Sequence, residues 1–169
     1  MKHDFRLAHE EDFLLILSIF KRATDHMNLQ GIHQWDEIYP DESILRSDLE
    51  RQEIYLLTSE KRIVSAVVVN EEQDPQYGTA DWNYRACKIA VMHRLCVDPD
   101  YQHHGMGKET IRCVEKMLLD KGYSSLRLDA FSQNESALKM YKGLGYIQIG
   151  DITFRKGLFH LFEKQLNQD

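Results

Sequence analysis

The sequence has little cysteine, no long apolar run and no excess of positive charge, and each shortage excludes a class of protein. Its three cysteines, Cys87, Cys96 and Cys113, are odd in number and lack paired spacing. We therefore expect buried thiols in a reducing, cytoplasmic setting, with no disulfide framework. The eight histidines do not combine with cysteines at zinc-like spacing, so we predict no metal site.

Targeting and membrane segments are also missing. The first residues lack the apolar core of a signal peptide, and no stretch is long and apolar enough to span a bilayer, so no membrane association is predicted. The net charge of −6 argues against non-specific nucleic-acid binding, which needs a basic face. We find no linker, repeat or low-complexity tract, and 169 residues suit a single domain over residues 1–169.

The most informative segment runs over residues 95–108. An apolar run ends at Val97, a polar turn follows, and Gly105 and Gly107 precede a helix-like segment over 108–121. Backbone N–H groups at a helix start point outward, the helix dipole adds positive charge there, and glycine lets a ligand approach the main chain. We predict an anion site, most naturally for a diphosphate. The alternative is a turn that only serves helix–strand packing.

Two familiar phosphate motifs do not fit this turn. A P-loop needs Ser or Thr after its Gly-Lys pair, whereas Gly107 and Lys108 are followed by Glu109. A dinucleotide fingerprint needs a small residue three positions after the second glycine, where Thr110 stands. The polar approach to the glycines therefore predicts a different kind of phosphate loop.

A second motif follows about thirty residues later. A strand over 126–130 ends in a polar turn, and a helix then runs to the glycines near residue 143. Ser132 and Glu135 have capping-box spacing, and Asn134 is itself a good N-cap. Asn134 and Tyr141 are seven residues apart, which places them on one helix face. Taken singly, Asn134 would only cap the helix and Tyr141 would only pack.

Together these segments resemble the GNAT superfamily of N-acetyltransferases. The likeness rests on Val-x-Pro at 97–99, Gln-x-x-Gly-x-Gly at 102–107 and Asn-x-x-Ala-x-x-x-Tyr-x-x-x-Gly-Tyr at 134–146. It implies that the protein binds acetyl-CoA and transfers the acetyl group to an amine of a small molecule or peptide. We expect direct attack, because no cysteine has a recognisable nucleophile setting. Two alternatives stay open: a non-catalytic acyl-CoA-binding sensor or interaction module, and another phosphate-bearing cofactor.

The resemblance also implies roles for single residues. The backbone of Leu95, Cys96 and Val97 would bind the pantetheine arm as an added strand, and Asn134 would contact the same arm. Tyr141 would lie near the sulfur and donate a proton to the departing thiolate. The main-chain N–H groups of the loop would hold the diphosphate; its residues are Gln102, His103, His104, Gly105, Met106, Gly107 and Lys108.

The general base is less clear from the sequence. Some relatives carry a glutamate where Val91 stands here. His93 lies two residues on and would share a strand face with Val91, Leu95 and Val97, so it is our first candidate for the base. The alternative is that His93 packs in the sheet with a hydrogen bond to a neighbour. Arg94 points away and is expected to form a structural ion pair.

The resemblance also implies an acceptor pocket that is closed by the segment between the first two helices. Trp35, Asp36 and Glu37 are the candidates there, and the two carboxylates are second choices for the base. The alternative is a surface turn with one anchored tryptophan. Glu71 and Glu72, at the end of a predicted strand, are weaker candidates.

The predicted fold is α/β, with element order β-α-α-β-β-β-α-β-α-β-β and a central mixed sheet flanked by helices. The strand–helix–strand crossover around 108–121 should be parallel and right-handed, and its two strands must part to admit a thioester arm. Exposed strand edges suggest a homodimer. Strands are expected at 5–7, 54–58, 62–70, 87–97, 125–130, 146–151 and 158–164, and helices at 10–26, 40–49, 108–121 and 134–143.

Overall fold

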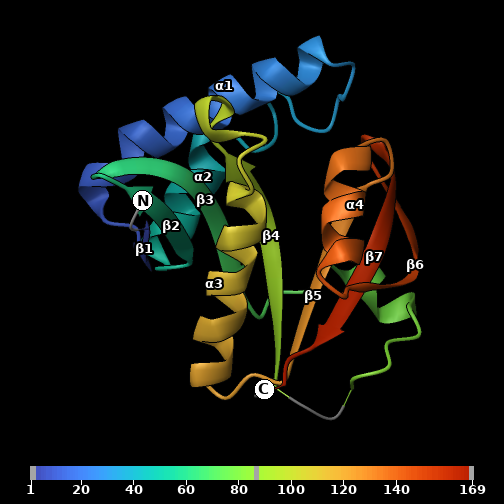
Figure 1. The fold of residues 1–169 in the computed structure, drawn as a ribbon. Coiled ribbons are helices and arrows are strands. Elements are labelled where there is room, and N and C mark those ends of the chain that lie inside the picture. The colour runs from blue at the N-terminus through green and yellow to red at the C-terminus, as the bar shows by residue number, and fades with distance from the viewer. Residues whose placement is uncertain (1–2, 86–87, 168–169) are drawn as a thin grey trace. The chain divides into compact units, whose positions relative to one another are not determined.

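The computed structural model describes residues 3–85 and 88–167. The chain contacts divide it into two units, residues 1–69 with 94–111 and residues 70–93 with 112–169. The unit boundaries fall within two elements, β4 (Ile89–Val97) and α3 (Met106–Asp120), which Figure 1 labels. A single domain over residues 1–169 stays a prediction.

The strands form a mixed seven-stranded sheet in the order β1-β2-β3-β4-β5-β7-β6. The described ladders are antiparallel except for the parallel pairing of β4 with β5. The remaining strands are β1 (His3–Leu7), β2 (Ile54–Ser59), β3 (Arg62–Asn70), β5 (Ser125–Phe131), β6 (Ile147–Phe154) and β7 (Gly157–Gln165). The remaining helices are η1 (Glu10–Asp12), α1 (Phe13–Leu29), α2 (Glu42–Glu50), η2 (Pro75–Thr79), η3 (Pro99–Tyr101) and α4 (Glu135–Gly143).

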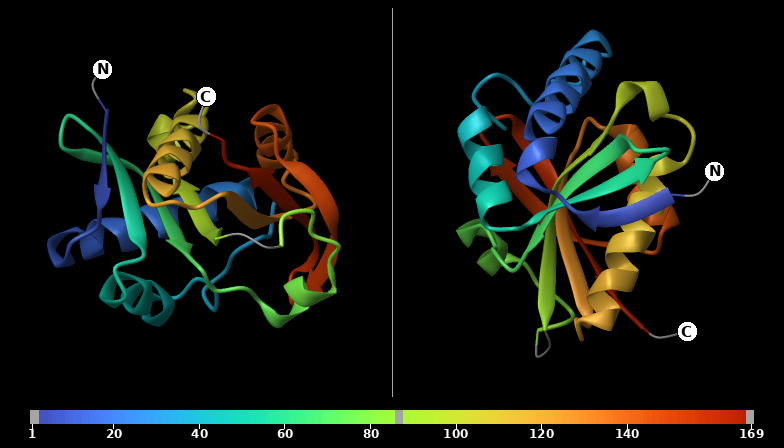
Figure 2. Two further views of the ribbon diagram at one scale, coloured as in Figure 1. Left: turned by 90° about the horizontal axis from the view of Figure 1, so that it is seen from below. Right: turned by 90° about the vertical axis from the view of Figure 1, so that its left-hand side faces the viewer.

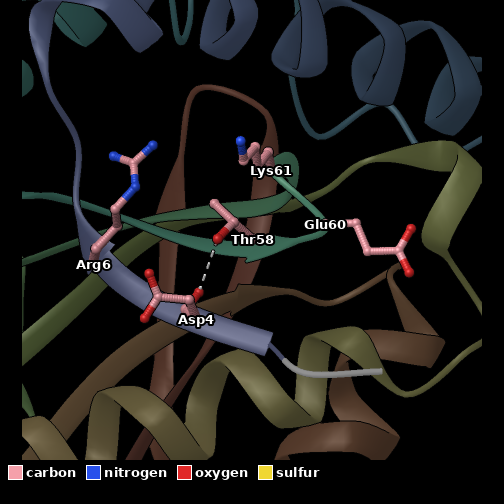
Figure 3. A pocket seen from close by; sticks show the side chains of 5 residues that line it. All are labelled: Asp4, Arg6, Thr58, Glu60 and Lys61. Atoms are coloured by element: carbon pink, nitrogen blue, oxygen red, sulfur yellow. Dashed lines mark hydrogen bonds between the residues drawn. The ribbon is translucent and has the colours of Figure 1, made fainter.

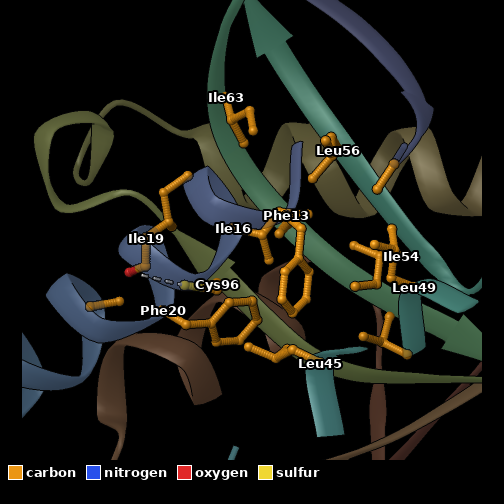
Figure 4. Packing of buried hydrophobic residues seen from close by; sticks show 14 of the residues in the cluster. Phe13, Ile16, Ile19, Phe20, Leu45, Leu49, Ile54, Leu56, Ile63 and Cys96 are labelled. Atoms are coloured by element: carbon orange, nitrogen blue, oxygen red, sulfur yellow. Dashed lines mark hydrogen bonds between the residues drawn. The ribbon is translucent and has the colours of Figure 1, made fainter. Parts of the chain in front are cut away.

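The first unit is built around the buried face of α1. Phe13, Ile16 and Phe20 recur at helical spacing and are almost fully buried. They pack with apolar residues of α2, β2 and β3 and with Cys96 of β4 (Figure 4). In the same unit β1 lies beside β2 as an antiparallel neighbour (Figure 2). One core therefore supports the end of β4 that leads into the glycine turn.

The second unit places β5 between β4 and β7. On one face of this sheet, α4 packs against β7, where the ring of Tyr141 lies 6.0 Å from that of Phe162 (Figure 1). On the same face, the Glu115 carboxylate links α3 to β7 and to the end of the α4 segment, because it accepts hydrogen bonds from Lys164 and from Tyr146. The segment over residues 71–84 contacts β5 and β7 on the other face, through side chains described below.

The predicted element order is confirmed, and the differences are local. The first helix begins with the short turn η1, because Asp12 accepts a hydrogen bond from the backbone of His9 before α1 starts. The segment over residues 71–81, for which no helix or strand is predicted, contains η2, which Asp74 caps. Asn134, and not Ser132, caps α4. The predicted strand start at Cys87 lies outside the described residues.

Candidate active site

The turn after β4 presents a series of backbone donors. His103 and Gly105 have positive φ angles of 63° and 80°, which turn the chain sharply into α3. Within the part of the chain that the structure describes, no acceptor bonds the backbone N–H groups of residues 103–108; the first such bond of the helix runs from Glu109 to Gly105. His103, His104, Gly105 and Lys108 are exposed. This arrangement suits an anion of several oxygens.

Buried polar contacts hold this turn in place. Thr110, in the first turn of α3, has no exposed surface, and its hydroxyl lies 2.6 Å from that of Ser65 on β3. The side chain of Asp98 is also buried; it accepts a hydrogen bond of 2.6 Å from Arg22 of α1. Gln102 donates to the carbonyl oxygen of Val97. These contacts therefore connect the turn that carries the backbone N–H donors of residues 103–108 to the buried core of the first unit.

β4 contains an irregularity at Arg94, whose φ of 51° lies in the left-handed region. Such a residue breaks the strict alternation of a strand, so the argument that His93 shares a face with Leu95 and Val97 does not hold across it. The Arg94 guanidinium binds both carboxylate oxygens of Asp48, at 2.9 Å and 2.8 Å, which confirms the predicted ion pair. A left-handed strand residue redirects the backbone groups that follow it.

The parallel ladder between β4 and β5 is short. Its described pairs run from Ile89 with Ser125 to Val91 with Arg127 and then end, although β5 stays paired with β7 as far as Phe131. The ladder therefore stops before β5 does, as the predicted entry of a thioester arm requires.

His93, the first residue on its face beyond this ladder, forms a hydrogen bond with a neighbouring side chain, as the alternative for this residue expected. Its Nε2 lies 2.8 Å from Oδ1 of Asn70, which also accepts a 2.9 Å hydrogen bond from the backbone N–H of Glu72. Because that backbone donor identifies the Asn70 atom as the oxygen, Nε2 of His93 carries the hydrogen. In a neutral ring of this tautomer the lone pair is on Nδ1.

Tyr141 is buried, at 7% exposure, between the rings of Tyr146 and Phe162. Burial, with a smaller contribution from the charge of Asp129, raises the pKa of its phenol well above the ordinary value of 10. None of the described residues forms a hydrogen bond with the Tyr141 hydroxyl. The phenol therefore keeps its proton at neutral pH and can offer it to another group.

Asn134 has the structural role that its sequence position allows. Its side chain accepts a hydrogen bond from the backbone N–H of Ala137 and so caps α4, two turns from Tyr141. Cys96 is buried against α1, and burial raises the pKa of its thiol far above the ordinary value of 9.0. A thiol that keeps its proton is a poor nucleophile, which agrees with direct attack by the acceptor.

The predicted acceptor pocket residues lie in the turn between α1 and α2. Trp35 is 5% exposed and packs on Phe20, with 5.3 Å between ring centroids. The Asp36 carboxylate accepts hydrogen bonds from the backbone N–H groups of Ile38 and Tyr39, while Glu37 is exposed. These contacts match the alternative of a surface turn with an anchored tryptophan. Their role in a pocket stays a prediction.

One hollow lies elsewhere in the first unit, on the outer strands (Figure 3). It measures about 300 Å³ and carries balanced charge; its lining residues are Asp4, Arg6, Thr58, Glu60 and Lys61. It includes none of the predicted site residues. Among the described residues, no three His, Cys, Asp or Glu side chains gather as a metal site, and no helix is both long and apolar enough to cross a membrane.

Comparison with known proteins decides the family. The family model for the acetyltransferase (GNAT) domain matches residues 23–162, most of the chain. The chain belongs to the GNAT acetyltransferase family. A thialysine N-epsilon-acetyltransferase from Bos taurus is 30% identical over 162 residues, which cover 93% of this chain and 89% of that protein.

Solved structures agree with this GNAT assignment at the level of the fold. A GNAT-family acetyltransferase from Streptococcus agalactiae has a TM-score of 0.87 at 15% identity, over 98% of this chain and 96% of that one. The PaiA N-acetyltransferase from Thermoplasma acidophilum, solved with coenzyme A, has a TM-score of 0.75 at 17% identity, over 98% and 99% of the two chains.

The predicted family, fold and reaction class are therefore confirmed: this is a GNAT N-acetyltransferase that uses acetyl-CoA. The roles of single residues, the acceptor, the homodimer and the cytoplasmic location stay predictions. Sequence reasoning missed Asp129 and its partner Tyr77. The available signal was a carboxylate, Asp129, in a strand whose other residues are all buried.

Proposed function

We propose that the protein acetylates a primary alkylamine by direct attack, with His93 as general base and Tyr141 as general acid. The observation that carries the proposal is the set of backbone N–H groups of residues 103–108, which have no acceptor among the described residues. A diphosphate supplies acceptor oxygens for several such donors, and the start of α3 adds favourable dipole charge. In the proposal this turn holds the diphosphate of acetyl-CoA.

The remaining cofactor contacts follow from the two motifs. We assign the pantetheine arm to the backbone of Leu95, Cys96 and Val97 and to the side chain of Asn134. Acetyl-CoA, when bound, supplies an activated acyl group as a thioester. A backbone N–H beyond the irregularity at Arg94 would stabilise negative charge on its carbonyl oxygen.

Proton transfers are assigned to two residues of the second unit. His93 accepts a proton from the amine at Nδ1, while Nε2 stays bound to Asn70. Tyr141 donates its proton to the departing sulfur. Because its pKa is raised, the phenol still carries that proton at neutral pH. Because the Cys96 thiol also keeps its proton, it is a poor nucleophile, and we assign no acetyl-enzyme intermediate to it.

The acceptor class is supported by charge and by one relative. Alkylamines are cations at neutral pH, and this chain carries a net charge of −6. The bovine relative is named as a thialysine N-epsilon-acetyltransferase, and the name states that the ε-nitrogen is acetylated. We therefore place a small molecule with a primary alkylamine first among acceptors.

An amine panel with acetyl-CoA tests the proposal by measuring thiol release. We expect amine-dependent release with at least one alkylamine, and a rate that falls in acid because a protonated imidazole cannot accept a proton. His93→Gln should remove that acid-side fall along with most of the rate. Binding of acetyl-CoA without thiol release for any amine would favour the non-catalytic sensor instead.

The diphosphate site has its own matched test. Gly105→Ala forces an L residue into a left-handed conformation and should raise the KM for acetyl-CoA. Gly150→Ala makes the same change where φ is ordinary and no atom lies within 4 Å, so its KM should match the wild type. Equal KM values for both variants would contradict the assignment of the turn.

A further inference from the structure

Asp129 lies at a position on β5 that corresponds to His93 on β4. The last described pair of their parallel ladder is Val91 with Arg127, and alternate residues of a strand share a face. The next positions on that face are His93 and Asp129, each two residues further along. His93 and Asp129 are therefore the first residues on this face beyond the end of the ladder, one on each of two adjacent strands.

Tyr77 holds the Asp129 carboxylate. Its hydroxyl donates a 2.6 Å hydrogen bond to Oδ2 of Asp129, and its ring is 1% exposed. A short hydrogen bond to a carboxylate is charge-assisted and fixes its orientation. Asp129 itself is only partly buried, so its carboxylate is held by a rigid neighbour while keeping some access to solvent.

The segment that carries Tyr77 is anchored along the same face of the sheet; we call residues 71–84 the covering segment. The Trp82 indole donates to the Tyr77 carbonyl oxygen at 2.7 Å and lies 4.1 Å from the Arg127 guanidinium. Arg127 also donates to the Gln73 side chain, and the backbone N–H of Asn83 donates to a carboxylate oxygen of buried Glu163, both at 2.7 Å. These contacts fix the covering segment over β5 and β7.

Asp129 is also electrostatically coupled to the proposed acid. Burial is the larger cause of the raised pKa of Tyr141, and the negative charge of Asp129 adds to it. Asp129 thus lies at the strand level of the proposed general base, in the same unit of the chain.

We propose that Asp129, oriented by Tyr77, binds the acceptor as an alkylammonium ion. This inference rests on the proposed function and names the chemistry that selects its substrate. The ammonium donates hydrogen bonds to the carboxylate and passes one proton to His93, which later releases it to solvent. The amine lone pair then forms the N–C bond and the C–S bond breaks. The sulfur keeps the electron pair of the broken C–S bond and takes a proton from Tyr141. The nitrogen then gives its second proton to the Tyr141 phenolate, which restores the phenol.

The test compares Asp129→Asn with wild type on two acceptors that differ in charge. One is a diaminoalkane, cationic at the assay pH; the other is an aromatic amine, neutral at that pH. A hydrogen bond to a charged group is worth about 10-fold to 100-fold in binding, so we expect kcat/KM for the diamine to fall by that factor. The value for the neutral amine should fall by less than about threefold.

Controls separate this inference from the proposed function. Asp81→Asn changes a fully exposed carboxylate on the covering segment and should keep wild-type kinetics on both amines. If Asp129→Asn does not fold, Tyr77→Phe removes only the orienting hydroxyl and should raise the KM for the diamine selectively. An equal loss on both amines, or no loss on the diamine, overturns the role of Asp129. A wild type without amine-dependent thiol release overturns the proposed function itself.

Discussion

Arg94 offers the sharpest test of how β4 is shaped. Its left-handed φ of 51° would favour glycine at this position, yet the residue is an arginine whose side chain is 11% exposed. Its bidentate partner Asp48 is 1% exposed and also accepts a hydrogen bond from Arg51. Although burial alone lowers the pKa of Arg94, Tyr39 and Asp48 raise it above the ordinary value, so the guanidinium stays charged.

The contacts set the size of the effect. Removing one member of a buried ion pair costs about 3–5 kcal/mol, because the other charge stays buried without compensation. Arg94→Ala should lose this amount, less whatever Arg51 recovers. Arg94→Gly loses the same ion pair but avoids about 1–2 kcal/mol of strain from the left-handed conformation. It also loses about 0.5–1 kcal/mol of stability, because glycine has more conformational freedom in the unfolded chain. We therefore expect the glycine variant to be at least as stable as the alanine variant, by up to about 1.5 kcal/mol.

Urea unfolding measures both variants, with the free energy of unfolding extrapolated to water. The control is Thr153 in β6, an exposed strand residue without a positive φ, where glycine should be less stable than alanine. The reasoning about Arg94 is refuted if Arg94→Ala costs less than about 1 kcal/mol, or if glycine is worse than alanine at both positions.

Three further predictions concern the site, acid stability and the core. Tyr141→Phe should lower kcat about 100-fold or more with little change in the KM for acetyl-CoA, whereas Tyr146→Phe should spare kcat; equal losses in kcat and cofactor affinity would contradict the acid role. The hydrogen bond from Arg6 lowers the pKa of Asp12 below 3.8, so the ionised carboxylate stabilises the fold above that pH and the contribution is lost as the pH falls through the folded value. Asp12→Asn should therefore flatten the acid limb of the stability curve, and an unchanged limb would exclude this linkage. Ile16→Ala, at a fully buried position, should cost about 2–5 kcal/mol in urea unfolding, whereas Leu14→Ala, 78% exposed, should stay within about 0.5 kcal/mol.

The sequence by itself determined the family, the element order and the glycine turn. These follow from local signals, because hydrophobic periodicity sets helices and strands, and the residue types at 102–107 and 134–146 form contiguous motifs. The N-cap of α4 was also within reach of local reasoning, as was the expectation that Arg94 forms an ion pair, although its partner was not.

Only the tertiary structure decided how residues distant in the chain combine. The partner of Arg94 is 46 residues away, and that of Tyr77 is 52 residues away. Neither spacing has a periodicity to detect, because the contacts depend on how strands pair and segments fold over them. The left-handed conformation of Arg94 in β4 could not be predicted for the same reason. It depends on the ion pair with the buried Asp48 carboxylate of α2, and that contact is formed only in the folded chain.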